Sequence, residues 1–325
     1  MKREINGLLI VDKREGITSL DVVREVKHRF GLKKAGHIGT LDPFATGVLP
    51  IAINEGTKLV PFIGEGPKEY AGTLRLGEET TTDDWTGKVV ASESWEGVQP
   101  EKIEAAFDAF LGKTYQTPPM FSAIKMHGKP LYRFARKGIE VERKERAVEI
   151  YEIRVEKIDL PLVFFKVSCS KGTYIRTLGR DIGRRIGCGG HLLGLRRIRS
   201  GPFKIEQAIA LERLKDLSGS DHLDPWLISL EAALPGLPEV IGDEPLVRKA
   251  RFGQEMMVQD LSSQTLPSFE KGEWLKMSSP EEGLVAILKS EVKKADIPWT
   301  NPEVVALRPL RVFQPQRQYS AEDTI

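Results

Sequence analysis

GHIGTLDPFATGVLP, residues 36–50, is the most informative segment of this chain. Its three glycines and two prolines predict that most of it is neither regular helix nor regular strand, because glycine favours left-handed backbone and proline removes an amide donor. Its one carboxylate, Asp42, directly precedes Pro43, which is the usual arrangement of a turn. The apolar run Leu8-Leu9-Ile10-Val11 earlier in the chain is typical of a buried strand. We therefore expect a rigid loop that presents a single carboxylate.

Length and composition are those of an ordinary globular protein. The chain has 325 residues, of which 40% are hydrophobic, and this length favours about two domains. No apolar run approaches the roughly 20 residues that a membrane span needs, and no signal-peptide pattern follows Met1. Only two cysteines occur, Cys169 and Cys188, which favours a reducing compartment over a disulfide framework. We expect a cytoplasmic protein with no membrane partner.

Charges are segregated along the chain, although the formal net charge is only +2. Residues 125–146 hold eight Lys or Arg against three Glu, and residues 176–199 hold seven Arg against one Asp. Residues 65–108 hold eleven acids against four bases. A single charged run is often just a solvated helix face, but two basic runs with aromatic or glycine-rich context favour a basic surface for a polyanion. We therefore expect both basic runs to contact nucleic-acid phosphates.

Hydrophobic periodicity predicts the main elements. Thr18 and Asp21 form a capping-box pattern, which predicts a helix whose apolar positions Leu20, Val23, Val26 and Phe30 face the core. The same reasoning predicts strands over 70–76, 162–170, 192–198, 284–288 and 304–312, and helices over 100–111 and 173–186.

A linker signature, Pro235-Gly236-Leu237-Pro238, divides the chain. We expect a first domain over 1–235, in which the basic, proline-containing segment 120–150 is an extended insertion, then a small β-rich domain over 240–315 and a tail over 316–325. The predicted fold class is α+β, with a mixed, mostly antiparallel central sheet, flanking helices and a C-terminal β-rich domain.

Sequence motifs of several common chemistries are missing. The five His and two Cys show no metal-ligand spacing, and there is no Walker loop, no GxGxxG after a strand and no GxSxG elbow. We therefore expect neither a metal nor a cofactor. What remains is the Asp42 carboxylate, a tyrosine at a strand start, Tyr70, and an arginine at a strand–helix junction, Arg176.

Five separated segments resemble the pseudouridine synthases of the TruB type. The first is the segment around Asp42, residues 36–50, called the Asp42 loop below. The others are Lys68-Glu69-Tyr70, Lys171-Gly172-Thr173-Tyr174-Ile175-Arg176, Cys188-Gly189-Gly190-His191 with Leu195-Arg196-Arg197, and Gly128-Lys129-Pro130-Leu131-Tyr132 with Gly138-Ile139-Glu140-Val141. The resemblance spans roughly the first 200 residues. Lys13 and Lys58 also match family positions, without an assigned role. The C-terminal domain resembles, less specifically, the RNA-binding PUA-like module of that family.

The resemblance implies an isomerase acting on tRNA. Uridine at position 55 in the T loop would lose its C1′–N1 bond, turn, and rejoin the ribose through C5, without cofactor or metal. Because the base is held inside a folded loop, it must first be flipped out, at a cost of a few kcal/mol. The T stem-loop of tRNA is then the expected partner, and we expect a monomeric enzyme.

The resemblance also assigns residues to roles. Asp42 would be the catalytic carboxylate, either as a nucleophile or as a base that takes a proton from the sugar. Arg176 would orient Asp42 and offset its desolvation, and Tyr70 would stack on the uracil and take part in proton transfer at C5. Three more side chains would bind the substrate: Tyr174 and Leu195 in the uracil pocket, and His37 in the place that the flipped base leaves.

Two other functions stay open. One is a catalytic subunit that modifies ribosomal RNA under the direction of a guide RNA, although the chain lacks a long Lys-rich tail. The other is a non-enzymatic RNA chaperone that folds tRNA with the same basic face.

Overall fold

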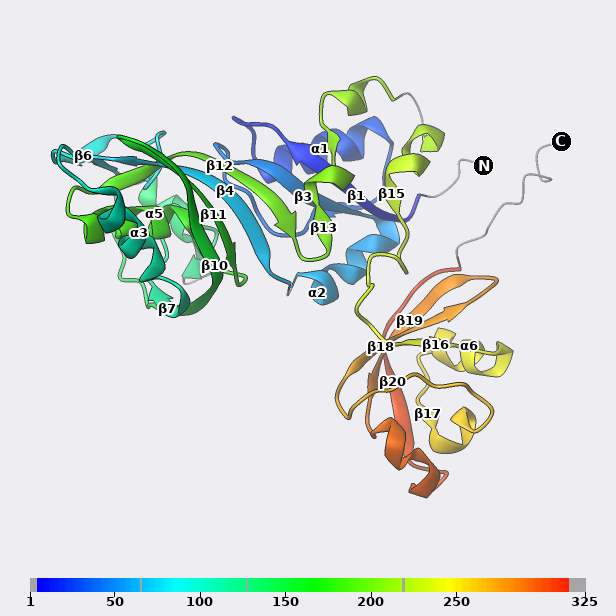
Figure 1. Cartoon of the computed structure of the whole chain (residues 1–325). Helices are drawn as coiled ribbons and strands as arrows, with labels where there is room; N and C mark the ends of the chain where they lie inside the picture. The colour runs from blue at the N-terminus through cyan, green and yellow to red at the C-terminus, as the bar shows by residue number, and fades with distance from the viewer. Residues whose placement is uncertain (1–4, 65, 127, 218–219, 316–325) are drawn as a thin grey trace.

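The computed structural model describes residues 5–64, 66–126, 128–217 and 220–315, which form two large sheets and two small two-stranded ones (Figure 1). The predicted tail over 316–325 lies outside the described residues. The larger, central sheet has 11 strands in the described part of the chain. Its main path runs β14 (Ile209–Ala210), β1 (Gly7–Lys13), β3 (Thr46–Ile53), β12 (Gly190–Ser200), β4 (Lys68–Leu76), β11 (Leu162–Cys169), β10 (Arg146–Asp159) and β7 (Gly112–Gln116).

The central sheet is mixed. Of the neighbours on the main path, β14 and β1 are parallel, as are β3 and β12, and the other pairs are antiparallel. Three short strands pair beside the path: β2 (Ala35–His37) on β3, β13 (Phe203–Lys204) on β12 and β15 (Leu227–Ile228) on β1. The predicted α+β class with a mixed, mostly antiparallel central sheet is confirmed.

Alternating burial explains the middle of this sheet. Along β4, Tyr70, Gly72, Leu74 and Leu76 are buried, as the period of two predicts. The same face of the sheet is covered by helices α3 (Pro100–Asp108) and α5 (Ile175–Ile186), whose apolar positions share one core with β4 and β11. The sheet and these two helices therefore form two packed layers, and this packing fixes the position of α5 (Figure 1).

Helix α1 (Ser19–Arg29) begins as predicted, with the side chain of Thr18 accepting from the Asp21 amide and the side chain of Asp21 accepting in return. The predicted core face is partly wrong, because Leu20 is 50% exposed and Val22 is buried instead. Positions 19, 22, 23 and 26 form the stripe at helical spacing that meets the sheet, and position 20 lies outside it.

The segment that carries Asp42 is irregular only between β2 and β3. The expectation of an irregular segment is wrong from Thr46 onward, because β3 includes Gly47 and Pro50. Pro50 lacks an amide, yet its carbonyl still accepts from the Ile38 amide at 2.9 Å. Gly47 has φ +100°, and a Cβ there would lie 2.2 Å from the Arg197 carbonyl oxygen, so the strands meet at this point only because position 47 is glycine.

The predicted extended insertion is in part regular structure. Residues 125–135 contain the short hairpin of β8 (Lys125–Met126) and β9 (Lys129–Pro130), followed by helix α4 (Leu131–Ala135). Leu131 anchors the helix, since it is 2% exposed. The remaining elements of this part are η1 (Asn54–Leu59), α2 (Val60–Ile63), β5 (Glu78–Thr80), β6 (Val89–Ser92), η2 (Ile205–Gln207), η3 (Arg213–Lys215) and η4 (Ser220–Trp226).

The C-terminal part is a five-stranded sheet in the order β16 (Glu239–Ile241), β18 (Trp274–Ser279), β19 (Gly283–Ser290), β20 (Val305–Val312) and β17 (Met256–Met257). Helix α6 (Glu244–Arg251) packs on it, and η5 (Val258–Leu261) and η6 (Lys294–Trp299) complete it. The predicted β-rich character is confirmed, whereas β18 and α6 were not predicted. The domain boundaries at 235 and 240 stay a prediction.

A shared apolar cluster joins the two sheets. Phe313, Leu284 and Ile287 from the C-terminal part pack with residues of β1 and β3 and with Ile38 from the segment before Asp42. Lys58 adds a polar contact, donating to the Val312 carbonyl at 2.8 Å. This cluster thus links the C-terminal sheet to β1 and β3, and Figure 1 shows that sheet below α2 and this end of the central sheet.

Candidate active site

The Asp42 loop is held at several backbone points. The Ser19 hydroxyl donates to the Leu41 carbonyl at 3.0 Å and accepts from the Leu41 amide at 2.9 Å. The Pro43 carbonyl accepts from the Gly16 amide at 2.8 Å and from Lys13 Nζ at 3.1 Å. The Asp42 side chain itself remains 34% exposed. The loop is therefore fixed by its neighbours while its carboxylate stays accessible.

Arg176 binds this carboxylate from the first turn of α5. Its Nε donates to Asp42 Oδ2 at 2.8 Å, Nη1 donates to the Thr82 carbonyl at 2.9 Å, and Nη2 donates to the Phe121 carbonyl at 2.8 Å. The guanidinium is 3% exposed, so three separate chain segments fix its plane. Burial alone would lower the pKa of Arg176, but the neighbouring carboxylates of Asp42 and Asp84 outweigh burial and raise it.

Asp84 is a second acidic neighbour of Arg176 and was not among the predicted site residues. Its Oδ2 lies 3.6 Å from Arg176 Nη1, and its side chain is 5% exposed. Hydroxyls of Thr82 and Thr86 donate to its Oδ1 at 2.8 and 2.5 Å, and Asp83 beside it has φ +60°. The threonine-rich turn TTTDDWTG was the available signal, because such hydroxyls fix a buried carboxylate.

Tyr70, on β4, lies within electrostatic reach of the Asp42 carboxylate. Its side chain is 7% exposed, and burial raises the pKa of its phenol, with the Arg197 guanidinium opposing the rise and the Asp42 carboxylate adding to it. The phenol therefore keeps its proton at neutral pH. Tyr70 is paired with Val167 of β11 on one side and with Arg197 of β12 on the other.

The other predicted substrate residues lie around the same loop. Tyr174 is half-buried just before α5, and Gln116 fixes its backbone, accepting from its amide at 3.0 Å and donating to its carbonyl at 3.3 Å. Leu195 is 8% exposed and lines a hollow of about 410 Å³, together with Phe44 from the Asp42 loop and Gly72.

His37 lies at the end of β2, on the chain leading into the loop. Burial, and then the nearby Arg197 charge, lower its pKa. Its Nδ1 is buried and has no hydrogen-bond partner among the residues that the structure describes. The structure therefore joins Asp42 to Arg176 directly and places Tyr70 within electrostatic reach of Asp42. His37, Tyr174 and Leu195 lie on neighbouring segments, and the roles of all six residues stay predictions.

The two basic runs differ in their surroundings. Most arginines of 176–199 are engaged within the protein: Arg180 pairs with Asp83 and Asp181, Arg184 with Glu79, Arg196 with Asp12 and Arg199 with Glu69. Arg184, Arg196 and Arg199 remain partly exposed in these ion pairs, so the expectation that this run contacts phosphates stays a prediction. The run over 125–146 is instead mostly exposed, at Lys125, Lys129, Arg133, Arg136, Lys137, Lys144 and Arg146.

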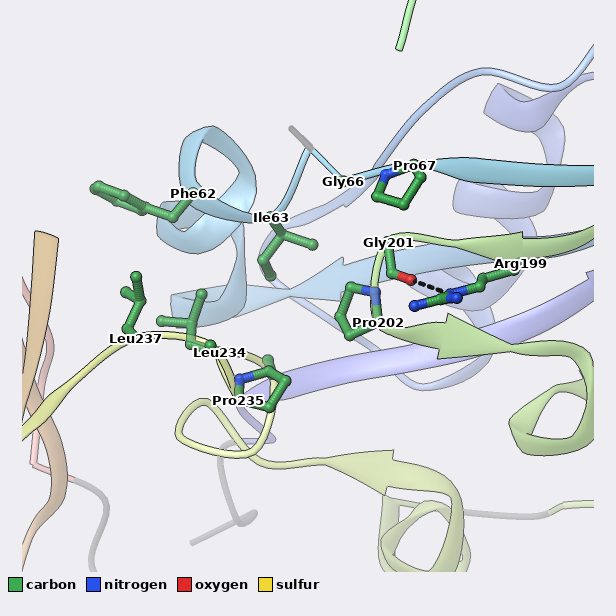
Figure 2. A pocket seen from close by; sticks show the side chains of 12 residues that line it. Phe62, Ile63, Gly66, Pro67, Arg199, Gly201, Pro202, Leu234, Pro235 and Leu237 are labelled. Carbon is green, nitrogen blue, oxygen red and sulfur yellow. Dashed lines mark hydrogen bonds between the residues drawn. The ribbon is translucent and has the colours of Figure 1, made fainter. Parts of the chain in front are cut away.

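A separate apolar groove lies between α2 and the segment 233–237 (Figure 2). It measures about 380 Å³ and is lined by Ile63, Pro202 and Leu234 among others. Arg199 at its rim donates from Nε to the Gly201 carbonyl at 2.8 Å, as Figure 2 shows. Among the described residues, Asp42, Tyr70 and Arg176 do not line this groove, so it is distinct from the candidate site.

The residues that the structure describes hold neither a cluster of metal-ligating side chains nor a helix fit to span a membrane. No group of three or more His, Cys, Asp or Glu side chains there is arranged to hold a metal ion. In the same part of the chain, no helix combines the length and the apolar character that crossing a membrane requires.

Family models match the chain in two consecutive stretches. Residues 27–175 match the TruB family pseudouridylate synthase N-terminal domain, and residues 176–235 match the tRNA pseudouridylate synthase B C-terminal domain. The junction between the two models falls immediately before Arg176. The two matches together therefore contain Asp42, Tyr70, Tyr174, Arg176 and Leu195.

Curated relatives agree with these matches. The chain is 51% identical to tRNA pseudouridine synthase B of Geobacter sulfurreducens, over 71% of this chain and 76% of the relative. It is 41% identical to tRNA pseudouridine synthase B of Syntrophus aciditrophicus, over 95% of this chain and 99% of the relative.

Solved structures show a similar architecture. A chain of a Cbf5–Nop10–Gar1 complex is 28% identical, with a TM-score of 0.72 over 95% of this chain and 85% of that one. A chain of an H/ACA ribonucleoprotein bound to a substrate RNA containing 2′-deoxyuridine is 26% identical, also with a TM-score of 0.72, over 97% of this chain and 87% of that one.

Proposed function

Since this chain belongs to the TruB family of pseudouridine synthases, we propose that it isomerises uridine 55 in the T loop of tRNA to pseudouridine. The chain is an isomerase that acts on tRNA, and the position in the T loop is the part that we propose. One observation carries the proposal: the accessible Asp42 carboxylate, bound at 2.8 Å by the buried Arg176. This arrangement supplies one oriented carboxylate where a flipped uridine can reach it.

In the proposed reaction, the C1′–N1 bond breaks, a C1′–C5 bond forms, the proton at C5 leaves and N1 gains a proton. Asp42 acts at the sugar, as nucleophile or as base, and Arg176 holds it in one orientation. The ring of Tyr70 stacks on the uracil. Because burial keeps the Tyr70 phenol protonated, it takes part in proton transfer at C5 only if its hydroxyl passes on its own proton.

The substrate is held from two sides in this proposal. Tyr174 and Leu195 line the uracil pocket, and His37 fills the place that the flipped base leaves, which returns part of the unstacking cost. The exposed basic side chains of 125–146 contact the phosphates of the T stem-loop. The C-terminal sheet acts as a PUA-like RNA-binding module.

We propose that the enzyme works in the cytoplasm as a monomer. Both cysteines are buried and unpaired, and burial raises the pKa of the Cys169 thiol to about 11. Two cysteines that form no disulfide are what a reducing compartment favours.

The experiment that tests the function is the substitution Asp42→Asn, which keeps the size of the side chain and removes its charge. We expect tRNA binding to be retained and pseudouridine formation to fall by about a thousandfold or more. Chemical mapping of pseudouridine in treated tRNA measures the product, since substrate and product have the same mass. Asp159→Asn is the matched control, because Asp159 pairs with Lys157 on the surface. Normal product formation by Asp42→Asn would sink the assignment.

The guide-RNA alternative finds support in the likeness to chains from H/ACA and Cbf5 complexes. The higher identity to the curated tRNA enzymes, which for one of them extends over nearly its full length, favours the stand-alone function. Activity of the pure protein on a bare T-arm stem-loop, without other RNA or protein, distinguishes the two. Comparing tRNA refolding by wild type and Asp42→Asn tests whether a chaperone activity exists beside catalysis.

A further inference from the structure

Arg197 stands where three strands of the central sheet meet. It belongs to β12, and its backbone pairs with Gly47 of β3 on one side and with Tyr70 of β4 on the other. Its side chain is 0% exposed and is among the largest fully buried side chains. Burying a guanidinium costs folding free energy unless its N–H groups are hydrogen-bonded. The hydrogen-bond partners of Arg197 therefore show which segments it fixes.

Those partners are three carbonyl oxygens of the chain that carries Asp42. Nε donates to Val48 at 2.7 Å, Nη1 to Thr40 at 3.2 Å and Nη2 to Gly39 at 2.9 Å. Gly39 and Thr40 precede Asp42, whereas Val48 follows it. One planar group therefore ties together the two arms of the loop, which a flexible ammonium cannot do with the same geometry.

The positive charge of Arg197 is not neutralised by an ion pair with any described carboxylate, so it acts on neighbouring side chains. Among the residues that the structure describes, Arg197 forms no ion pair with a carboxylate, in contrast to its neighbour Arg196, which binds Asp12 at 2.6 Å. Its positive charge lowers the pKa of His37 and opposes the rise at Tyr70. Arg197 therefore faces the two candidate site residues that flank the loop, as well as the loop itself.

We propose that Arg197 is a positioning residue that fixes the Asp42 loop relative to Tyr70 and His37. In this role its hydrogen bonds go to the backbone carbonyls around Asp42 and to the Tyr70 phenol, and not to the Asp42 carboxylate. Its function is to keep the Asp42 carboxylate and the Tyr70 ring at a fixed separation while the base is flipped and turned. This inference rests on the proposed function, because it requires Asp42 and Tyr70 to act on one uridine.

The test compares Arg197→Lys and Arg197→Met with Arg199→Lys, a matched control on the same strand whose ion pair with Glu69 lies at the surface. For Arg197→Lys we expect cooperative unfolding and tRNA affinity within about twofold of wild type, with affinity measured in the Asp42→Asn background. The single-turnover rate should fall about a hundredfold, the effect of a displacement of about 1 Å in a reacting pair. Arg199→Lys should leave the rate unchanged.

Two readouts separate positioning from mere stability. The Tyr70→Phe and Arg197→Lys effects on the rate should be less than multiplicative, because both act on one geometry. Amide hydrogen exchange over residues 38–45 should accelerate in Arg197→Met, and the NMR-monitored pKa of His37 should rise. These last two measurements need no turnover, so they test whether Arg197 fixes the Asp42 loop even if the proposed reaction is wrong.

A wild-type single-turnover rate in Arg197→Lys would overturn the inference. So would equal losses of rate and of tRNA affinity, since a positioning residue acts after binding. Unfolding of both Arg197 variants would overturn it as well, because Arg197 would then serve the fold alone.

Discussion

Lys13 is another fully buried cation beside the Asp42 loop. Its Nζ donates to three backbone carbonyls, those of Arg14, Ile17 and Pro43, at 2.9, 2.9 and 3.1 Å. Burial lowers its pKa from 10.5 to about 8, Asp42 and Glu15 oppose this, and Arg197 and Arg14 add to it. Near neutral pH the fold therefore bears the cost of a buried charge to hold the residue that follows Asp42.

The substitution Lys13→Met should change how stability depends on pH. Between pH 8 and 10.5 the unfolded chain keeps the Lys13 proton while the folded chain loses it, so raising the pH relieves the cost of burying the cation. The free energy of unfolding of wild type should thus rise relative to the variant, by at most about 1.4 kcal/mol per pH unit. Urea denaturation at several pH values between 7 and 10.5 measures this.

Lys27→Met, on the exposed side of α1, is the control for the Lys13 substitution and should run parallel to wild type. Parallel curves for Lys13→Met and wild type would show that Lys13 does not titrate in this range.

At the scale of single residues, the sequence predicted the groups that are chemically conspicuous. Asp42, Tyr70 and Arg176 stand in unusual local contexts, and they converge in the structure. Asp84 and the contacts of Arg197 were missed, because one acid in an acidic stretch and one arginine in an arginine run look alike in sequence. Burial and backbone partners distinguish them, and these partners come from distant segments: the Arg176–Thr82 hydrogen bond spans 94 residues and the Arg197–Val48 hydrogen bond spans 149.

At the scale of elements, periodic patterns predicted β4, β11 and the cap of α1. They failed at the start of β3, where a glycine and a proline occur inside a strand because Arg197 and Ile38 meet the chain there. They also failed to separate the two basic runs, because the acids that neutralise Arg180, Arg184 and Arg199 are contributed by residues 69–83.

The basic insertion is the element expected to carry the salt dependence of binding. Replacing Lys129, Arg133 and Lys137 by Gln should weaken tRNA binding and lower the slope of log affinity against log salt by up to about 3, with the rate at saturating tRNA little changed. Filter binding over a range of salt concentrations measures the slope.

The control for the insertion replaces Arg154 and Lys157 of β10, which are paired with Glu156 and Asp159. If the salt slope falls equally in the insertion variant and in the β10 control, the insertion is not the segment that binds the tRNA phosphates.

At the scale of the whole molecule, the two sheets share one apolar cluster. Phe313 is 1% exposed within it, and Phe62 of α2 meets Trp274 of β18 with ring centroids 5.0 Å apart. No sequence pattern predicted this contact, because a linker signature such as Pro235-Gly236-Leu237-Pro238 says where parts divide and not how they pack.

Phe313→Ala should therefore weaken the joint between the sheets. The lost side chain should cost about 3–5 kcal/mol, and the thermal unfolding of the two parts should separate into two transitions. Calorimetry detects both effects. Phe252→Ala is the control, since Phe252 is 71% exposed and should leave the transition unchanged. A single transition at the wild-type temperature would show that the cluster does not couple the parts.

The shared cluster also has a consequence for folding during synthesis on the ribosome. Ile38, which leads into the Asp42 loop, packs in the same cluster as Phe313, which is added near the end of synthesis. At about 5–20 residues per second, the interval between the two is on the order of ten to fifty seconds. During that time Ile38 lacks its packing partner Phe313, so the apolar cluster behind the Asp42 loop is completed only when synthesis is nearly finished.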